Sequence, residues 1–411
     1  MKKSIKKRIE AVRRGEVPEG YVFQNHQLRP VDWEYEKIGK YLVPYDEFSN
    51  DTEAYPLATS SRQGLMLQSE YYNNQRYEET SGGFHVVPEG YVTYRHMSDD
   101  DIFRFNVNRM GNSVLVSPEY PVFTTSDGLH QDMLVSYLNN MKEFKAYCSA
   151  QKKGSSRTRM YFSRLGEFAM PIPPVKEQQK IAEILATCDR MIELTQQLLE
   201  EKRRQKQWLM RTLLNPESGV RLPGFEEEWS TGSFSGVCTF INGRAYKQDE
   251  LLEKGKYPVL RVGNLFTKSD WYYSDMELPA HMYIDNGDLI YAWSASFGPQ
   301  IWAGEKVIFH YHIWKVLPNN VVCKEYLYQY FLYDVDQLSR EQQGGTMAHI
   351  TKESMEKRVC KYPTIAEQQR IAEILDTADQ DVLLAENNLE FWQQRKKALM
   401  QLLLTLTERS L

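Results

Sequence analysis

Apolar residues recur at alternating steps of four and three along two long stretches of the chain. This heptad spacing predicts two long helices, each with a narrow apolar seam that needs a partner. No Gly or Pro interrupts either stretch after the prolines at 173–174 and 363, so these prolines mark the helix starts. The seam residues that we expect to pair are Ile181, Leu185, Leu199, Leu209, Ile371, Leu375, Leu389 and Leu399.

The two helical stretches are copies of one sequence. Residues 173–185 read PPVKEQQKIAEIL, and residues 363–375 read PTIAEQQRIAEIL at an offset that holds without a gap to Leu214 and Leu404. A single long helix cannot bury its own seam, so we expect the copies to pair with each other, and antiparallel because a large block separates them. The alternative is that each helix packs on its own domain.

The remaining sequence forms two blocks that we predict to be mixed α/β. Short β-rich runs, such as 257–262 and 289–293, alternate with Gly and Asn turns. Turn signals at 285–288 and 88–90 each come directly before a predicted strand. The predicted organisation is a basic N-terminal helix and lead-in at 1–30, a first globular domain at 31–170, a first long helix at 171–218, a second globular domain at 219–360 and a second long helix at 361–411.

Composition limits the class of protein. The 411 residues carry a net charge of −5, so any nucleic-acid binding must come from local clusters such as 2–14 and 151–164, whose alternative is a solvated surface. The five cysteines are far apart and form no CxxC pair, which predicts reduced thiols and neither a disulfide framework nor a zinc site. No apolar run is long enough for a membrane span and no signal peptide is recognisable, so we expect a cytoplasmic protein without a membrane partner.

The duplicated helix start and the heptad helix that follows it closely resemble the conserved regions of Type I restriction–modification specificity subunits. Three further segments fit this resemblance: Arg221-Leu222-Pro223-Gly224-Phe225 with Trp229, its weaker partner at 28–33, and GGTMAHITK at 344–352. The basic segment 2–14 is similar to the tail end of a conserved helix moved to the N-terminus by a circular arrangement of the repeat.

The resemblance implies a protein without catalytic activity or cofactor. Its two globular domains would be target-recognition domains that each read one half of a bipartite target in double-stranded DNA. The helices would set the gap between the halves and dock two methyltransferase (modification) subunits, to which restriction (endonuclease/translocase) subunits are added. The assembled complex would carry out adenine-N6 methylation or restriction.

Motifs for independent catalysis are missing from the sequence. The Pro-Pro pair at 173–174 lacks the flanking residues of an amino-methyltransferase loop, and neither a Walker A loop nor an HExxH motif is present. Glu143-Phe144-Lys145 resembles a nuclease triplet but falls in a helical pattern at 134–145. His310 and His312 alternate on a predicted strand, where strand surface or DNA contact is a better interpretation than a metal pair without a third ligand. We therefore predict neither catalytic residues nor a metal site.

Candidate DNA-binding residues are polar or basic side chains in the two globular blocks, because such side chains contact base edges and phosphates. Two rival hypotheses remain: a coiled-coil adaptor that binds only proteins, which predicts no positive surface on the blocks, and a self-sufficient DNA-modifying enzyme, which needs a methyl-donor site. The candidates are Arg95, Arg104, Asn106, Arg109, Lys152, Lys153, Arg157 and Arg159 in the first block and Arg244, Lys247, Arg261, Asn264, Lys268, Ser294, Ser296, Gln300, Thr346 and His349 in the second.

Overall fold

The chain divides into two compact units in a computed structural model. Unit 1 comprises Met1–Glu193 and Glu390–Leu411, and unit 2 comprises Leu194–Leu389. The units therefore share the two long helices, which the sequence analysis placed in segments of their own. The structure describes residues 10–12, 14–24, 27–71, 83–152, 157–266, 270–294, 298–341 and 351–404.

Both predicted long helices are present. Helix α6 spans Val175–Leu213 and helix α11 spans Ile365–Leu404. Each begins two residues after the proline that marks its start, and each continues without interruption through residues that favour the helical backbone.

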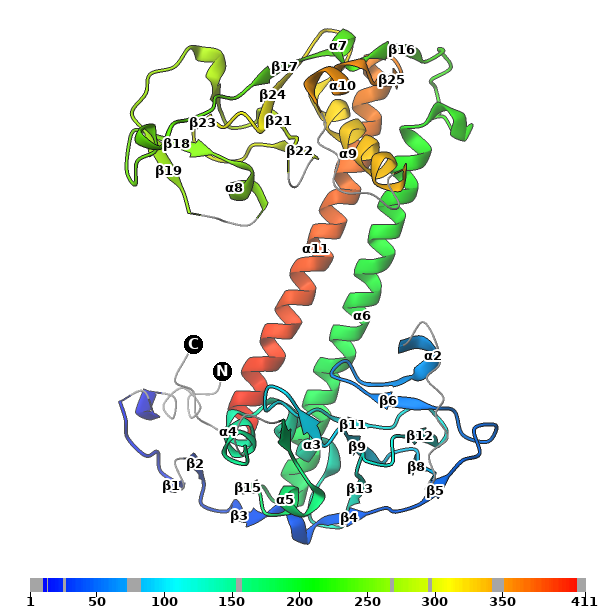
Figure 1. The fold of residues 1–411 in the computed structure, drawn as a ribbon, viewed down its shortest axis with the longest axis vertical. Coiled ribbons are helices and arrows are strands. Elements are labelled where there is room, and N and C mark those ends of the chain that lie inside the picture. The colour runs from blue at the N-terminus through cyan, green and yellow to red at the C-terminus, as the bar shows by residue number, and fades with distance from the viewer. Residues whose placement is uncertain are drawn as a thin grey trace. The chain divides into compact units, whose positions relative to one another are not determined.

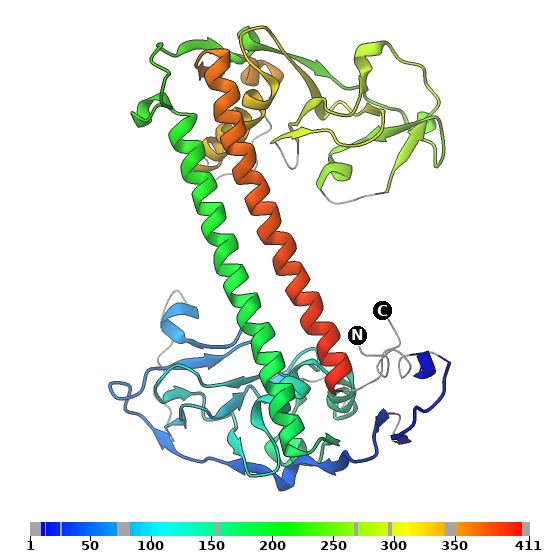
Figure 2. The ribbon, with the colours of Figure 1, turned by 180° about the vertical axis from the view of Figure 1, so that it is seen from behind.

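The two helices pack against each other in an antiparallel direction within each unit (Figure 1 and Figure 2). In unit 1, Ile181 and Leu185 from the start of α6 share a buried cluster with Met400 and Leu404 from the end of α11. In unit 2 the order is reversed, and the end of α6 shares a cluster with Ile371 and Leu375 from the start of α11. The predicted antiparallel pairing is confirmed in both units.

The seam combines apolar contacts with ion pairs. Of the eight predicted pairing residues, Leu209, Leu389 and Leu399 are half-buried and the other five are buried. Lysines also occupy seam positions: Lys206 pairs with Asp379 in unit 2, and Lys396 pairs with Asp189 in unit 1. These two pairs are related by the offset of the sequence repeat, so the duplication preserved a cross-helix ion pair together with the apolar seam.

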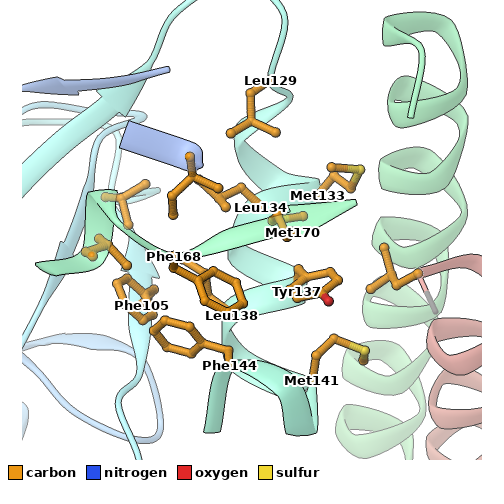
Figure 3. Close-up of a cluster of buried hydrophobic side chains, with 14 of the residues drawn as sticks. Phe105, Leu129, Met133, Leu134, Tyr137, Leu138, Met141, Phe144, Phe168 and Met170 are labelled. Atoms are coloured by element: carbon orange, nitrogen blue, oxygen red, sulfur yellow. The ribbon is translucent and has the colours of Figure 1, made fainter. Parts of the chain in front are cut away.

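The main sheet of unit 1 is antiparallel and packs against helices. Its order is β11(Phe105–Val107)-β9(Val92–Tyr94)-β13(Val122–Thr125)-β4(Leu42–Pro44). Helices α3(Gln131–Asn140) and α4(Lys142–Ala150) join it in one buried cluster that also includes residues of both long helices. In Figure 3, Tyr137 and Met141 lie on the side of this cluster toward the long helices, whereas Phe105, Phe144 and Phe168 lie on the other side.

Shorter elements complete unit 1. A second sheet has the order β12(Val114–Val116)-β8(Phe84–Val87)-β5(Phe48–Ser49). The two-stranded pairs are β1(Tyr21–Gln24) with β2(Gln27–Pro30), β3(Glu34–Lys37) with β15(Ala169–Ile172), β6(Ala58–Ser60) with β7(Leu65–Leu67), and β10(Met97–Ser98) with β14(Thr158–Arg159). The short helices are η1(Ile38–Lys40), α2(Gln68–Tyr71) and α5(Phe162–Gly166).

Unit 2 repeats the main sheet of unit 1 with different residues. Its order is β17(Cys238–Asn242)-β24(Ile313–Pro318)-β21(Leu289–Ala292)-β22(Gly298–Ile301), again antiparallel. This order matches β4-β13-β9-β11 strand for strand, and helix α9(Lys324–Glu341) covers the cluster beneath it. The mixed α/β fold and the internal repeat are therefore confirmed by the structure.

The second sheet of unit 2 contains a parallel pair. Its order is β19(Tyr272–Ser274)-β18(Tyr257–Leu260)-β23(Val307–Phe309)-β20(Tyr283–Ile284), and β18 runs parallel to β23. Strands β16(Ser230–Ser233) and β25(Val359–Tyr362) form a separate pair. The short helices are η2(Pro216–Ser218), α7(Phe234–Val237), η3(Gln248–Glu250), α8(Val262–Phe266), η4(Ala280–Met282) and α10(Lys352–Lys357).

The turns and the helical segment that the sequence predicts are present, the helical segment with one interruption. The predicted turns before β9 and β21 are confirmed: Gly90 and Gly287 adopt positive φ angles of 85° and 88°, which favour glycine. The predicted helical pattern at 134–145 is present as two helices, because Met141 is extended and separates α3 from α4 while its side chain stays in the core. No helix among the described residues is long and apolar enough to cross a membrane.

Candidate nucleic-acid interface

In each unit, one buried glutamine forms hydrogen bonds between the start of a long helix and the globular part. In unit 1, Gln178 accepts a hydrogen bond from the His130 amide (2.6 Å) and donates to the carbonyls of Gly128 (2.8 Å) and Pro173 (2.7 Å). Its counterpart Gln368 accepts from the Cys323 amide (2.9 Å). Gln368 also donates to the carbonyls of Val321 and Pro363, at 2.8 Å each. The repeated Glu-Gln motif thus contains an amide that satisfies three backbone groups in each unit, and we call this arrangement the Gln clamp.

The neighbouring glutamates hold the lead-in segments that precede each globular part. Glu177 accepts a hydrogen bond from the indole Nε1 of Trp33 at 3.1 Å. Glu367, whose side chain is 1% exposed, receives two hydrogen bonds from the guanidinium of Arg221, at 3.0 and 2.7 Å. Two of the three segments that supported the sequence resemblance, at 28–33 and 221–229, therefore contact the start of a long helix.

Three basic or imidazole-bearing residues converge at one edge of unit 2. Arg261 follows β18 and His310 follows β23, and because these neighbouring strands are parallel, both residues lie at the same edge of the sheet. Arg244, just beyond β17, joins them through its backbone: its amide donates to Phe309 and its carbonyl accepts from Tyr311. We call the group Arg244, Arg261, His310, Tyr311 and His312 the recognition edge.

Aromatic rings and hydrogen bonds hold the arginines of the recognition edge in place. The Arg261 guanidinium lies 4.3 Å from the centroid of the Tyr272 ring and donates to the carbonyl of Asp270 at 2.9 Å. The Arg244 guanidinium lies 5.4 Å from the Tyr246 ring and donates to Glu250 at 2.7 Å. Stacking on an aromatic ring positions a guanidinium without neutralising it, and arginine over a ring is a common element of nucleic-acid surfaces. Arg244 in addition forms an ion pair with Glu250.

Residues 310–312 form the turn between β23 and β24, so the predicted strand at this position is wrong. Their rings gather with centroid distances of 4.4 Å (His310–Tyr311), 4.0 Å (Tyr311–His312) and 4.9 Å (His310–His312). Burial, with smaller contributions from the neighbouring His312 and Arg261, lowers the pKa of His310 to about 4. The imidazole is therefore neutral near pH 7, with one ring nitrogen a donor and the other an acceptor. In the described part of the chain, no group of three or more His, Cys, Asp or Glu side chains could hold a metal ion.

In unit 1, arginines gather around a cavity of about 390 Å³. Arg62 comes from the turn between β6 and β7, whereas Arg95 and Arg104 come from the turns around β9 to β11. Hydroxyl groups of Thr59, Ser60 and Ser61 add polar atoms to the same lining. We call this site the arginine cavity, and it brings together Arg95 and Arg104, which the sequence predicted, with Arg62, which it did not.

The basic residues near position 157 are not free of partners. Arg157 donates to Asp99 at 2.7 Å, and the Lys152 ammonium lies 3.8 Å from Asp101. Burial raises the pKa of Asp100, but hydrogen bonds from Arg62 and Ser98 outweigh burial and leave the pKa below its ordinary value. The hydrogen bond from Thr158 lowers the pKa of Asp101, and the charge of Lys152 adds to this effect. Asp100 and Asp101 are therefore ionised near pH 7.

The other candidate residues have separate positions. Asn106 is buried and donates to Ser60 Oγ and the Ser61 carbonyl, so it supports the cavity wall and is not retained as a DNA contact. Asn264 accepts the Arg261 amide at the start of α8. Exposed or half-exposed candidates elsewhere are Arg109, which pairs with Asp132, and Arg159, Lys247, Ser294 and Gln300. Lys153, Lys268, Ser296, Thr346 and His349 lie outside the described residues.

Arg62 and the three aspartates could not be identified from the sequence because no local pattern marks them. Arg62 is a lone basic residue in a short hairpin turn, and Asp99, Asp100 and Asp101 read as a solvated turn. Only the pairing of β10 with β14 brings this turn beside Arg157. His310, Tyr311 and His312 did carry a signal, namely their unusual adjacency.

Comparisons with known proteins cover most of the chain. The family described as the Type I restriction modification DNA specificity domain matches residues 66–202 and 226–390. The MjaVIII specificity subunit of a Type I restriction enzyme from Methanocaldococcus jannaschii is 21% identical over 415 residues, which is 92% of this chain and 94% of the relative. The EcoBI specificity subunit from Escherichia coli is 23% identical over 158 residues, which is 38% of this chain and 33% of the relative.

Solved structures share the fold. The crystal structure of the S subunit of a Type I restriction–modification system from M. genitalium superposes with a TM-score of 0.59 at 14% identity, covering 95% of this chain and 99% of that one. A chain from a structure of Type I restriction–modification complex assembly gives a TM-score of 0.53 at 16% identity, covering 92% and 98%. The sheet order and the two long helices thus belong to a fold seen in other proteins.

Proposed function

Because the chain belongs to the Type I restriction modification DNA specificity family, and is therefore a specificity subunit and not itself an enzyme, we propose that its two units each read one half of a bipartite DNA target. The observation that carries this proposal is the pair of different basic surfaces on two units that share a framework. Unit 1 presents the arginine cavity and unit 2 presents the recognition edge, while the main sheets of the two units share one strand order.

The chemistry of both surfaces fits duplex DNA. Arginine contacts phosphates without regard to sequence and also binds guanine edges through two parallel hydrogen bonds. A neutral imidazole such as His310 adds one donor and one acceptor, which suits a base edge better than a phosphate. The recognition edge therefore combines groups for phosphate contact with groups for base contact.

The long helices have exposed apolar residues that support docking of other subunits. Leu194 on α6 and Leu384 on α11 are 42% and 61% exposed, and the sequence repeat relates these two positions. Grouped exposed apolar residues mark protein interfaces, and Leu198, one turn after Leu194 on α6, is also 48% exposed. We infer that two methyltransferase subunits bind at these equivalent positions, that the helices set the gap between half-sites, and that the complex methylates adenine N6 or recruits restriction subunits.

The rival hypotheses fit less well. A coiled-coil adaptor would need no basic surface on its globular parts, whereas both units gather arginines. A self-sufficient DNA-modifying enzyme would not be expected in a family of specificity subunits. We therefore expect the purified chain alone to show neither methylation nor cleavage of DNA, and either activity in the absence of other subunits would overturn the assignment.

A salt titration tests the DNA contact directly. Binding of the full chain to a random-sequence duplex is measured by fluorescence anisotropy at several salt concentrations, for the wild type, Arg261→Ala and Lys256→Ala. Each lost phosphate contact should reduce the slope of log K against log salt by about 0.9. Lys256 precedes β18 and Arg261 follows it, so the two substitutions remove one charge from opposite ends of the same strand.

The expected result is a smaller slope for Arg261→Ala and a slope equal to that of the wild type for Lys256→Ala. Equal slopes for all three proteins would show that Arg261 makes no phosphate contact. No binding by the wild type at low salt would overturn the proposed function.

A further inference from the structure

Three consecutive aspartates in unit 1 each pair with a basic residue from a different part of the chain. Arg157 Nε lies 2.7 Å from Asp99, Arg62 Nη2 lies 2.6 Å from Asp100, and Lys152 Nζ lies 3.8 Å from Asp101. We call Asp99-Asp100-Asp101 the acidic turn. It follows β10, and its partners come from the β6–β7 turn, the end of α4 and the residue before β14.

The acidic turn is held rigidly by its own hydrogen bonds. Ser98 Oγ donates to Asp100 at 2.9 Å and accepts from the Ile102 amide at 3.1 Å, while the Thr158 hydroxyl donates to Asp101. Asp101 has a φ of 62°, a conformation that non-glycine residues adopt rarely and only where surrounding contacts hold it. The carboxylates of Asp100 and Asp101 are therefore held in position.

The acidic turn also borders the arginine cavity. Asp99 and Arg62 line this cavity together with Arg95 and Arg104. The side chains of Arg62 and Arg157 are 64% and 56% exposed, so both pairs are open to solvent and their partners can exchange. A DNA phosphate offers a guanidinium the same arrangement of two anionic oxygens as a carboxylate does.

We propose that the acidic turn competes with DNA phosphates for Arg62 and Arg157 and so lowers the affinity of unit 1 for DNA of any sequence. This inference rests on the proposed function, because it concerns the regulation of the same DNA-binding surface. Binding then requires these arginines to leave their carboxylates, and the remaining aspartates repel the DNA backbone. The cost is the same for every duplex, so only a duplex whose base contacts compensate for it binds tightly.

The test compares binding of the full chain to a random-sequence duplex by fluorescence anisotropy at low salt. Asp100→Asn should bind about two- to fivefold more tightly than the wild type, the range expected for release of an exposed ion pair. Asp127→Asn is the matched control, because it removes the same charge from an exposed turn of the same unit outside the acidic turn. Its affinity should change by less than that of Asp100→Asn.

A double-mutant cycle shows whether Arg62 transmits the effect. In an Arg62→Met background, the gain from Asp100→Asn should largely disappear. If Asp100→Asn disturbs folding, Asp99→Asn provides the second variant, since it releases Arg157 and leaves Asp100 in place. Asp100→Asn or Asp99→Asn protein with a wild-type melting curve and no gain in affinity would overturn this inference. If the wild-type chain binds no duplex, the proposed function is overturned as well. If the wild type binds and the variants show no gain, only this inference is overturned.

Discussion

His310 makes the stability of unit 2 depend on pH. Its imidazole titrates at about 4 in the folded chain, compared with 6.5 for an unperturbed histidine, and the first cause is burial at the recognition edge. Between these values the unfolded chain binds a proton that the folded chain excludes. The stability contributed by the neutral ring is therefore complete above pH 6.5 and is lost as the pH falls toward 4.

Replacing His310 with Asn should flatten this part of the pH profile. We expect wild-type unit 2 to melt at progressively lower temperature as the pH is lowered from 6.5 to about 4, and His310→Asn to show a weaker dependence over the same range. His281→Asn is the control, because His281 is exposed. Parallel pH profiles for wild type and His310→Asn, measured by thermal unfolding, would show that the imidazole is not held neutral.

At the scale of single residues, the sequence predicted the kind of side chain better than its environment. Arg95 and Arg104 lie together at one cavity, whereas Asn106 is buried among serines. Arg157 pairs with an aspartate from a distant strand end. Burial and ion pairing depend on residues far apart in the chain, and no local pattern encodes them.

At the scale of elements, the start of each long helix repeats the same hydrogen bonds in both units. Gln178 and Gln368 are both fully buried, and each satisfies one backbone amide and two carbonyls. A side chain without an amide would leave these three groups unpaired in the protein interior, which costs free energy for each of them. The Gln clamp therefore joins α6 to the loop before α3 in unit 1, and α11 to the loop before α9 in unit 2.

Gln178→Met should loosen this loop in unit 1 only. We expect a loss of about 2–3 kcal/mol in local stability, so the His130 amide should exchange with deuterium on the order of a hundredfold faster. Hydrogen exchange with mass spectrometry reads peptides around His130 and Cys323 in the same experiment. Gln368→Met should affect the Cys323 peptide instead.

The adjacent Gln179 provides the control for Gln178. It is exposed, so Gln179→Met should leave both peptides at their wild-type exchange rates. Faster exchange around His130 in Gln179→Met, or unchanged exchange in Gln178→Met, would contradict the clamp.

Long helices and their pairing could be predicted because their signals are local and repeated. The heptad spacing and the copied segment indicated α6 and α11, and packing of Ile181 with Met400 confirms the antiparallel direction in unit 1. The common strand order of the two sheets could not be predicted. Its strands are three to six residues long, and their pairing depends on partners far along the chain rather than on local propensity.

At the scale of the whole molecule, the chain combines one repeated framework with two different surfaces. The strand order of the main sheet, the Gln clamp and the Lys–Asp pair are present in both units. The arginine cavity and the recognition edge, in contrast, are formed by different sets of side chains. A protein that reads two different half-sites needs this combination, because the framework can stay constant while each surface changes independently.

If the helices set the gap between half-sites, lengthening one helix should change that gap. Inserting four residues between Gln196 and Gln197 adds about one turn, or ~6 Å of rise, and so largely preserves the facing of the residues that follow. DNA advances about 3.4 Å per base pair. The unread gap should lengthen by one or two base pairs, or stay unchanged where the helix absorbs the insertion as a local stutter. Altered bases within a half-site would place base contacts on the helices and contradict the proposal.

The central claim is that two units read two halves of one target, and mapping of methylated adenines across a genome tests it most directly. The measurement uses cells that carry the chain with its cognate modification subunit, alongside cells that carry the His312→Ala variant. We predict a motif of two short specified parts separated by an unspecified gap, with only one part relaxed in the variant. A single continuous motif, or relaxation of both parts by His312→Ala, would contradict the account.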